Sequence, residues 1–239
     1  MDTDFSLASL IVWYVVFLFS TTFHEFSHAV LALWGGDRTA YEGGQVSLDP
    51  LPHIRRSPFG LVVVPLITFP LLGWMIGWAS APFDPRWAAG HPRRYAAMSA
   101  AGPFANLLLA TIAFFAIKLL VGHGVLELSR APTSLDQLVQ APGADGYRTP
   151  LGALAMVLSV MLNLNVLLGV FNLMPLPPLD GASVLEGLSP RTLGSFFDKV
   201  RTTPAFGFLG MVIAFNGFRY IAGPALYFVH GALYGVPLL

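Results

Sequence analysis

A His-Glu-x-x-His pattern, His24-Glu25-Phe26-Ser27-His28, lies inside a long apolar stretch of the chain. Residues four positions apart face the same side of an α-helix, so both imidazoles can reach one metal ion. Glu25 is rotated by about 100° from His24, which leaves it close enough to accept a proton from water held at that ion. The pattern therefore predicts metal-assisted hydrolysis, with the two histidines as ligands and Glu25 as the general base.

The same three residues have a purely structural interpretation, in which neighbours satisfy two helix-facing histidines and a neutral glutamate. The stretch around them, Phe5 to Trp34, contains no Lys, Arg or Asp. Ionisable side chains are costly in lipid, and clustered ones there are a functional hypothesis by default. The apolar setting therefore favours the catalytic interpretation.

A catalytic zinc site usually has three protein ligands and an open position for water, so the two histidines need a partner. Asp180 is the best candidate, because it follows a segment (175–178) with three prolines in four residues, which cannot continue a helix. Broken backbone at membrane depth is tolerated when it is buried in protein or lines a wet cavity, which would let this carboxylate point inward. The alternative is an ordinary proline-rich turn at a membrane surface. The remaining histidines, which lie in loops or near the ends of apolar stretches, are weaker candidates: His53, His91, His123 and His230.

Two further segments accompany HEFSH, namely AGPFAN at residues 101–106 and FNLMPLPPLDG at residues 171–181. Together the three segments resemble the site-2 protease family of intramembrane zinc metalloproteases, whose signature pairs HExxH with an Asn, prolines and Leu-Asp-Gly. The 101–106 segment is similar to that family's GPxxN element.

The resemblance implies one zinc ion per chain, held by His24, His28 and Asp180, with Glu25 as the general base. It also implies that Asn172 positions the substrate or helps to stabilise the oxyanion of the tetrahedral intermediate. The structural residues implied by the shared motifs are Gly102, Pro103, Asn106 and Gly181. Asn106 and Asn165 are further expected to form hydrogen bonds between helices.

The segment GQVSLDP at 44–50, followed by His53, looks like that of a compact subfamily without PDZ or nucleotide-sensing domains. The resemblance thus implies a single membrane-embedded protease domain over residues 1–239. Gln45, Val46, Ser47 and Leu48 form a strand-like run that could bind a locally extended substrate by strand addition. A plain connecting hairpin is an equal alternative for this run, and His53 is expected to be structural.

The composition indicates an integral membrane protein. Of 239 residues, 55% are hydrophobic and only 11% are charged, and the mean hydropathy is +0.66. A soluble fold of this size needs more charged surface, since about 25% charged residues is usual. The 13 basic and 13 acidic residues balance, which excludes nucleic acid as a partner. The absence of Cys excludes disulfides and Cys-ligated metals, so any metal is held by His, Asp or Glu.

We therefore expect an all-α, polytopic helical bundle with a three-helix catalytic core, a short β-hairpin and a re-entrant element. The last apolar stretch contains Arg219 and a Gly223-Pro224 break, so it is one broken helix or two short ones. The expected order is an HExxH helix (5–34), a hairpin and re-entrant element (35–94), a GPxxN helix (95–121), a loop (122–150), an LDG helix with an unwound turn (151–182) and C-terminal helices (183–239).

The re-entrant element follows from the number of membrane crossings between the two motifs. HEFSH lies near the C-terminal end of one apolar stretch, and Asp180 lies just past the C-terminal end of another (Leu151–Met174). Both ends must face the same side of the membrane to share one ion. Of the two apolar stretches between them, one therefore does not cross, and Phe59–Ser80, with its Pro and Gly breaks, is the candidate.

Loop charges give the orientation. If 59–80 is re-entrant, nine of the 13 Lys and Arg fall in 35–94 and 175–204, and two fall in 122–150. The positive-inside rule then places the active-site end in the cytoplasm and the acidic N-terminus outside. The N-terminus carries Asp2 and Asp4 and no basic residue, so the first stretch does not read as a signal peptide and is expected to be retained. We expect a multi-pass protein, most simply of a cell inner membrane.

The expected partners are the lipid bilayer and a membrane-protein substrate with a transmembrane helix, while a regulatory partner and the oligomeric state stay open. Two other function classes compete. A non-proteolytic zinc scaffold would keep the ligands but has no need of Glu25. A metal transporter would need ionisable residues along a path through the membrane, whereas here they cluster at one depth.

Overall fold

The computed structural model describes residues 7–130, 132–143 and 149–235. Within these ranges four helices are long and apolar enough to cross a membrane. Proline, which suits the first turn of a helix, begins three of them. The four are α1 (Leu7–Gly35), α6 (Pro92–Gly122), α7 (Pro150–Asn172) and α10 (Pro204–Tyr234).

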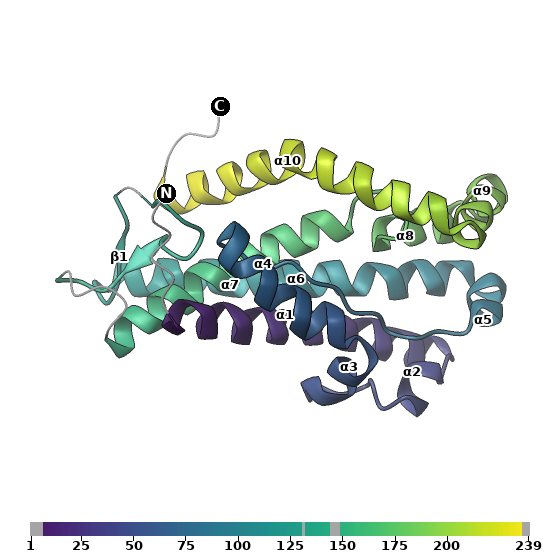
Figure 1. Ribbon diagram of the computed structural model, residues 1–239. Coiled ribbons are helices and arrows are strands. Elements are labelled where there is room, and N and C mark those ends of the chain that lie inside the picture. The colour runs from purple at the N-terminus through teal and green to yellow at the C-terminus, as the bar shows by residue number, and fades with distance from the viewer. Residues whose placement is uncertain (1–6, 131, 144–148, 236–239) are drawn as a thin grey trace.

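The helix α6 lies at the centre of the bundle and packs against α1 and α7 (Figure 1). It also packs against α8 (Asp180–Leu188), while α10 covers α7 and contacts α9 (Pro190–Thr202). This arrangement confirms the expected polytopic helical fold. The last apolar stretch is one continuous helix that includes Pro224. The prediction that the N-terminus, with Asp2 and Asp4, lies on the non-cytoplasmic side concerns residues outside the described ranges.

The segment between α1 and α6 enters the bundle and returns to the end it came from. The short helices α2 (Thr39–Glu42) and α3 (Pro50–Arg56) precede a π-helical turn, η1 (Phe59–Val63), and α4 (Val64–Leu72). The axis turns by 112° between α3 and the η1–α4 unit. An extended stretch then leads back to α5 (Pro85–Gly90), which packs against α6 at one end of the molecule (Figure 1).

Hydrogen bonds fix this return. The backbone N–H of Trp78 donates to the Gly60 carbonyl (3.2 Å), and Nε of Arg56 donates to the Ser80 carbonyl (2.9 Å). A Cβ on Gly60 would collide with the Trp78 carbonyl, so only glycine allows the two segments to lie this close. Arg56 and Ser80, at the two ends of this segment, are therefore neighbours, which is the path expected of a re-entrant element.

The hairpin lies elsewhere than expected. The strands β1 (Glu127–Leu128) and β2 (Val139–Gln140) pair antiparallel within the 122–150 loop. The described chain over 35–94 contains helices and turns but no strand, so the placement of the hairpin there is wrong.

The run Gln45 to Leu48 is a turn between α2 and α3. Asp49 caps α3 by accepting from the Leu51 N–H (2.9 Å), and the His53 ring donates to the Ser47 carbonyl (3.0 Å). The helix cap and this ring contact favour a bent backbone over an extended strand at 45–48. The ring contact is also the structural role expected of His53.

Candidate metal centre

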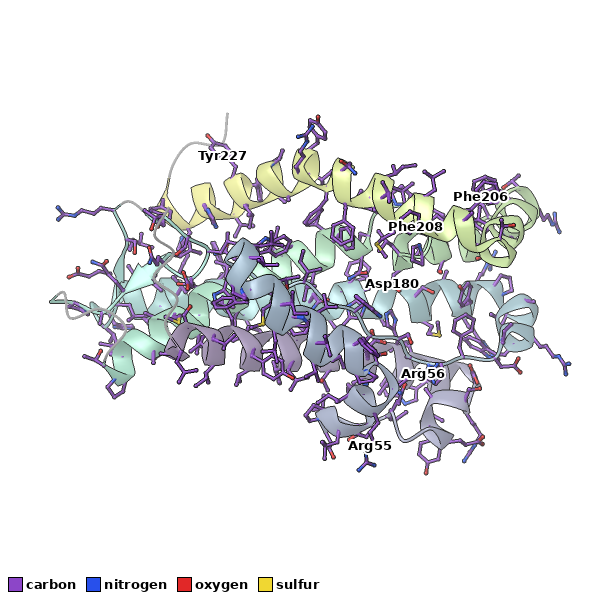
Figure 2. The ribbon with its side chains drawn as sticks, in the orientation of Figure 1. Arg55, Arg56, Asp180, Phe206, Phe208 and Tyr227 are labelled. Atoms are coloured by element: carbon purple, nitrogen blue, oxygen red, sulfur yellow. The ribbon has the colours of Figure 1, made fainter. Side chains whose placement is uncertain are left out.

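The bundle brings the two separated motifs to one place. Because α6 runs antiparallel to both neighbours, α1 and α7 run parallel (Figure 1), and the end of α7 lies level with the HExxH turn of α1. The chain unwinds after Asn172 over residues 173–179 and restarts as α8 at Asp180. The side chain of Asp180 is 23% exposed and is labelled near the middle of the helices in Figure 2. A Cβ on Gly181 would collide with the Leu173 and Met174 carbonyls, so glycine lets the new helix start close against the end of α7.

Three ligand atoms converge there. Nε2 of His24 lies 3.0 Å from Nε2 of His28 and 3.1 Å from Oδ2 of Asp180. The remaining pair, Nε2 of His28 and Oδ2 of Asp180, is 3.4 Å apart. A tetrahedral zinc ion with bonds of about 2.0–2.1 Å separates its ligand atoms by about 3.3 Å. The three spacings are therefore close to those of a zinc site, and two imidazoles with a carboxylate are ligands that zinc accepts.

The outer ring nitrogens fix the tautomer of both histidines. Nδ1 of His28 lies 2.7 Å from the Met98 carbonyl, which only accepts, so this nitrogen carries the proton. Nδ1 of His24 lies 2.6 Å from Oδ1 of Asn106, whose Nδ2 is itself a donor to Asn165. Both Nε2 atoms are thus left as acceptors that face each other and a carboxylate. Three acceptors at this spacing repel one another unless a cation or a shared proton lies between them.

Glu25 lies beside this cluster with an unsatisfied oxygen. The residue is 4% exposed. Within the described chain no group donates a hydrogen bond to its Oε2. A buried polar atom without a partner is costly, and a water molecule at the metal would satisfy it. The position suits a general base.

Gly102 on α6 supplies the room for the ion. A Cβ at this position would collide with Nε2 of both His24 and His28. The glycine of the GPxxN element therefore opens the space on which the three ligand atoms converge. Its neighbour Pro103 is buried, and a Cβ on Gly169 of α7 would lie 3.3 Å from the Pro103 carbonyl, which shows how closely the two helices pack.

Gly102→Ala is expected to lower zinc content sharply, because overpacking a tight site costs about 1–3 kcal/mol, or about 5- to 150-fold in affinity. Zinc measured by mass spectrometry on the purified protein checks this. Gly122→Ala is the control at the end of the same helix, where a Cβ meets nothing within 4 Å. Full zinc retention in Gly102→Ala would contradict the role given to this glycine.

A buried polar network ties the three core helices together behind His24. Nδ2 of Asn106 donates to Oδ1 of Asn165 (2.8 Å), and Nδ2 of Asn165 donates to Oγ of Ser20 (2.9 Å). All three residues are fully buried. The expected hydrogen bonds between helices are therefore present, and they also orient a candidate ligand. Such partners of metal-bound histidines raise metal affinity.

Asn106→Ala is expected to weaken zinc binding by about 10–100-fold, because the His24 ring loses the acceptor that orients it. Competition with a chelator of known affinity measures the change. Asn165→Ala leaves the His24–Asn106 bond in place and should lower affinity less. An equal loss in the two variants would show that the network acts only through helix packing.

Sequence reasoning expected Asn106 to join helices but missed its bond to His24, and it missed the Met98 carbonyl altogether. Gly102 and Asn106 are four residues apart and so share one face of α6, and this spacing was the available signal. A backbone acceptor such as Met98 has no signature in the sequence.

Other predicted site residues lie apart from the cluster. Nδ2 of Asn172 donates to the Leu168 carbonyl one turn back (3.0 Å), and no hydrogen bond joins it to the ligand cluster in the described part of the chain. In the 45–48 run, Gln45 is buried and Leu48 is exposed. The roles given to Asn172 and to this run stay predictions.

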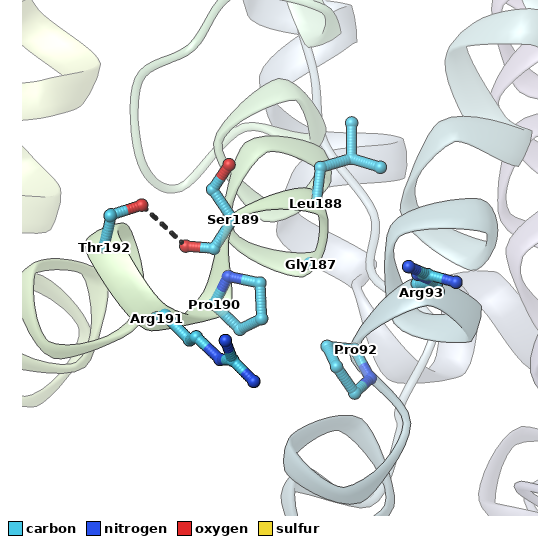
Figure 3. A pocket seen from close by; sticks show the side chains of 8 residues that line it. All are labelled: Pro92, Arg93, Gly187, Leu188, Ser189, Pro190, Arg191 and Thr192. Atoms are coloured by element: carbon cyan, nitrogen blue, oxygen red, sulfur yellow. Dashed lines mark hydrogen bonds between the residues drawn. The ribbon is translucent and has the colours of Figure 1, made fainter.

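A surface cavity opens between the start of α6 and the junction of α8 and α9 (Figure 3). None of the candidate metal ligands lines it, so it is distinct from the buried cluster. Its lining residues are Pro92, Arg93, Gly187, Leu188, Ser189, Pro190, Arg191 and Thr192.

Comparison with known proteins gives two similarities. The sequence model of peptidase family M50 matches residues 12–215, which contain the whole cluster. A protein of Bacillus subtilis (strain 168), named "Putative zinc metalloprotease YwhC", is 32% identical over 202 residues, covering 84% of this chain and 78% of that protein. No solved structure gives a significant match.

Proposed function

The chain belongs to peptidase family M50 and is a metalloprotease, and from this premise we propose that it performs regulated intramembrane proteolysis. It hydrolyses a peptide bond in or near the transmembrane segment of a membrane protein. One zinc ion per chain is held by His24, His28 and Asp180. The observation that carries the proposal is the convergence of three acceptor atoms, 3.0–3.4 Å apart, within a bundle of helices long enough to cross a membrane.

Each protein group has one task in this proposal. Zinc, when bound, supplies a Lewis acid that lowers the pKa of water and stabilises negative charge on the scissile carbonyl oxygen. Glu25 accepts the proton of the attacking water at its unsatisfied carboxylate oxygen and passes it to the leaving amine. Asn106 and the Met98 carbonyl hold the two imidazoles in the tautomer that presents Nε2. Asn172, after a change of side-chain rotamer, helps to bind the substrate or the oxyanion.

The substrate must be extended at the cleaved bond, because a helical peptide bond is shielded by its own hydrogen bonds. Gln45, Val46, Ser47 and Leu48 lie in the loop that follows the catalytic helix and are proposed to contact this extended segment. Since the run is a turn in the free protein, any strand pairing forms only with substrate.

Reconstitution into liposomes tests the function. The purified protein is incubated with a panel of transmembrane peptides that carry a fluorophore and a quencher on either side of a helix-destabilised centre. Cleavage should stop after a chelator has removed zinc and return when zinc is added. Cleavage that persists in the metal-free protein would contradict the proposal.

The protein is proposed to lie in a cell inner membrane with its active-site end in the cytoplasm and its N-terminus outside. Support comes from the basic loops, since nine of the 13 Lys and Arg lie in 35–94 and 175–204. The chain has no Cys, so single cysteines can be introduced without a background signal.

Ser57→Cys and Asp84→Cys are expected to react with an impermeant thiol reagent from the cytoplasmic face only. Gly124→Cys, in the loop at the other end of α6, should react only from the opposite face. Labelling of Ser57→Cys and Asp84→Cys from opposite faces would show that 59–80 crosses the membrane.

A further inference from the structure

The outward face of α10 carries polar residues where lipid should be. Asn216, Arg219, Tyr220, Gly223 and Tyr227 recur at helical spacing on this face and are all exposed; we call them the α10 stripe. Figure 2 shows Tyr227 directed away from the bundle. Of the four candidate spans, α10 is the least buried by the rest of the protein. The stripe begins just past residue 215, where the match to the M50 family model ends.

Arg219 lies deep in the span. It is 15 residues from either end of α10, or about 22 Å at 1.5 Å per residue. The ring of Phe218, next to it, packs on Phe171 in the last turn of α7, with ring centroids 5.0 Å apart. This turn of α10 is thus level with the end of α7, where the metal centre lies. Arginine reaches the membrane surface by snorkelling only near helix ends, so at this depth its charge faces hydrocarbon.

The described contacts of Arg219 provide no counter-ion for its charge. Nη2 donates to the hydroxyl of Tyr220 (2.6 Å), and the guanidinium lies 4.7 Å from the centre of the Tyr220 ring. No carboxylate whose side chain the structure describes forms an ion pair with Arg219. The remaining guanidinium N–H groups and the Tyr220 O–H together form a set of donors that matches a carboxylate.

We propose that the α10 stripe binds a transmembrane helix of a different membrane protein through an Asp or Glu that pairs with Arg219. Only a membrane-spanning helix brings a carboxylate to this depth, because lipid phosphates lie at the interface. A second copy of this chain does not supply it. The spans α1, α6, α7 and α10 contain one acidic residue, Glu25, which is buried in the metal centre.

The position of the stripe also indicates a partner rather than the segment that is cleaved. The opposite face of α10 packs towards α7 and the turn after it, through Ala214 and Phe218. A helix on the stripe is therefore separated from the metal centre by α10 itself. At Gly223 a Cβ would meet nothing within 4 Å, so the bare glycine lets a second helix approach closely.

Energy transfer between labelled molecules tests the proposal. The full-length protein is reconstituted in phosphatidylcholine bilayers with a leucine-rich transmembrane peptide of about 20 residues that carries Glu at its centre. The matched peptides carry Gln at the centre, or Glu near one end. Wild type should bind the central-Glu peptide about tenfold more tightly than the central-Gln peptide, as expected for one polar contact between helices in a membrane.

Arg219→Leu should abolish this preference, and Arg219→Lys should keep part of it. Ile221→Ala should keep all of it, because Ile221 is exposed but lies about 200° around α10 from Arg219. Zinc content and helicity of each variant confirm that it is folded. Three results would overturn the proposal: equal binding of the Glu and Gln peptides, a preference that survives Arg219→Leu, or displacement of the peptide by phosphatidylglycerol. Self-association of the protein that depends on Arg219 would also overturn it, since the occupant would then be a second copy.

Discussion

Glu25→Gln is expected to abolish cleavage of transmembrane peptides while leaving zinc bound. The amide is close in size to the carboxylate but does not accept a proton from water, and a general base contributes roughly 10²- to 10⁴-fold to a rate. None of the three converging ligand atoms belongs to Glu25, so the metal affinity should change little. The cleavage rate in liposomes and the zinc content, measured on the same preparation, check both halves of the prediction.

Glu186→Gln is the control for this substitution, because it makes the same chemical change in α8, outside the metal cluster. It should keep both activity and zinc. Loss of zinc in Glu25→Gln would show that Glu25 is a ligand or holds the site together. Unchanged cleavage would remove Glu25 from the reaction.

Asp180→Asn is expected to release zinc. The substitution removes the negative charge from the ligand set and leaves the two imidazoles with a neutral amide. The loss of affinity should exceed the 10- to 100-fold that follows removal of an outer partner, that is, about 100-fold or more. Titration with zinc in the presence of a competing chelator measures it.

Asp49→Asn provides the matched control. Asp49 caps α3 at the surface, and Asn is an equally good cap, so this variant should bind zinc as wild type does. If Asp180→Asn also keeps wild-type affinity, the third ligand is a residue other than Asp180 and the assigned centre is wrong.

The candidate ligands could be predicted from the sequence because each belongs to a local pattern with a physical meaning. His24 and His28 share one helical face, and the prolines before Asp180 end a helix where a carboxylate follows. Parity of the spans then required a returning segment, and Arg56 and Ser80 are hydrogen-bonded neighbours as that path demands. These inferences needed only helix periodicity and the cost of charge in lipid.

Other features depend on contacts between distant segments, so their signals in the sequence are weaker. The bond from His24 to Asn106 joins residues 82 positions apart, and the Met98 acceptor is a backbone atom. The hairpin was misplaced because Val46 and its neighbours have strand-like composition, whereas the capping of α3 by Asp49 decides the local backbone. Pro224 indicated a break, yet α10 continues through it as one helix.

Glu25 and the metal cluster beside it are proposed to cleave membrane proteins within the bilayer. The most direct test compares new N-termini, by mass spectrometry, in membranes of cells that carry either wild type or Glu25→Gln at equal levels. We expect fragments whose new ends lie in or beside transmembrane segments in cells with wild type. In cells with the variant these fragments should be absent and their uncut precursors should accumulate. The same fragments at the same abundance in both cell lines would contradict it.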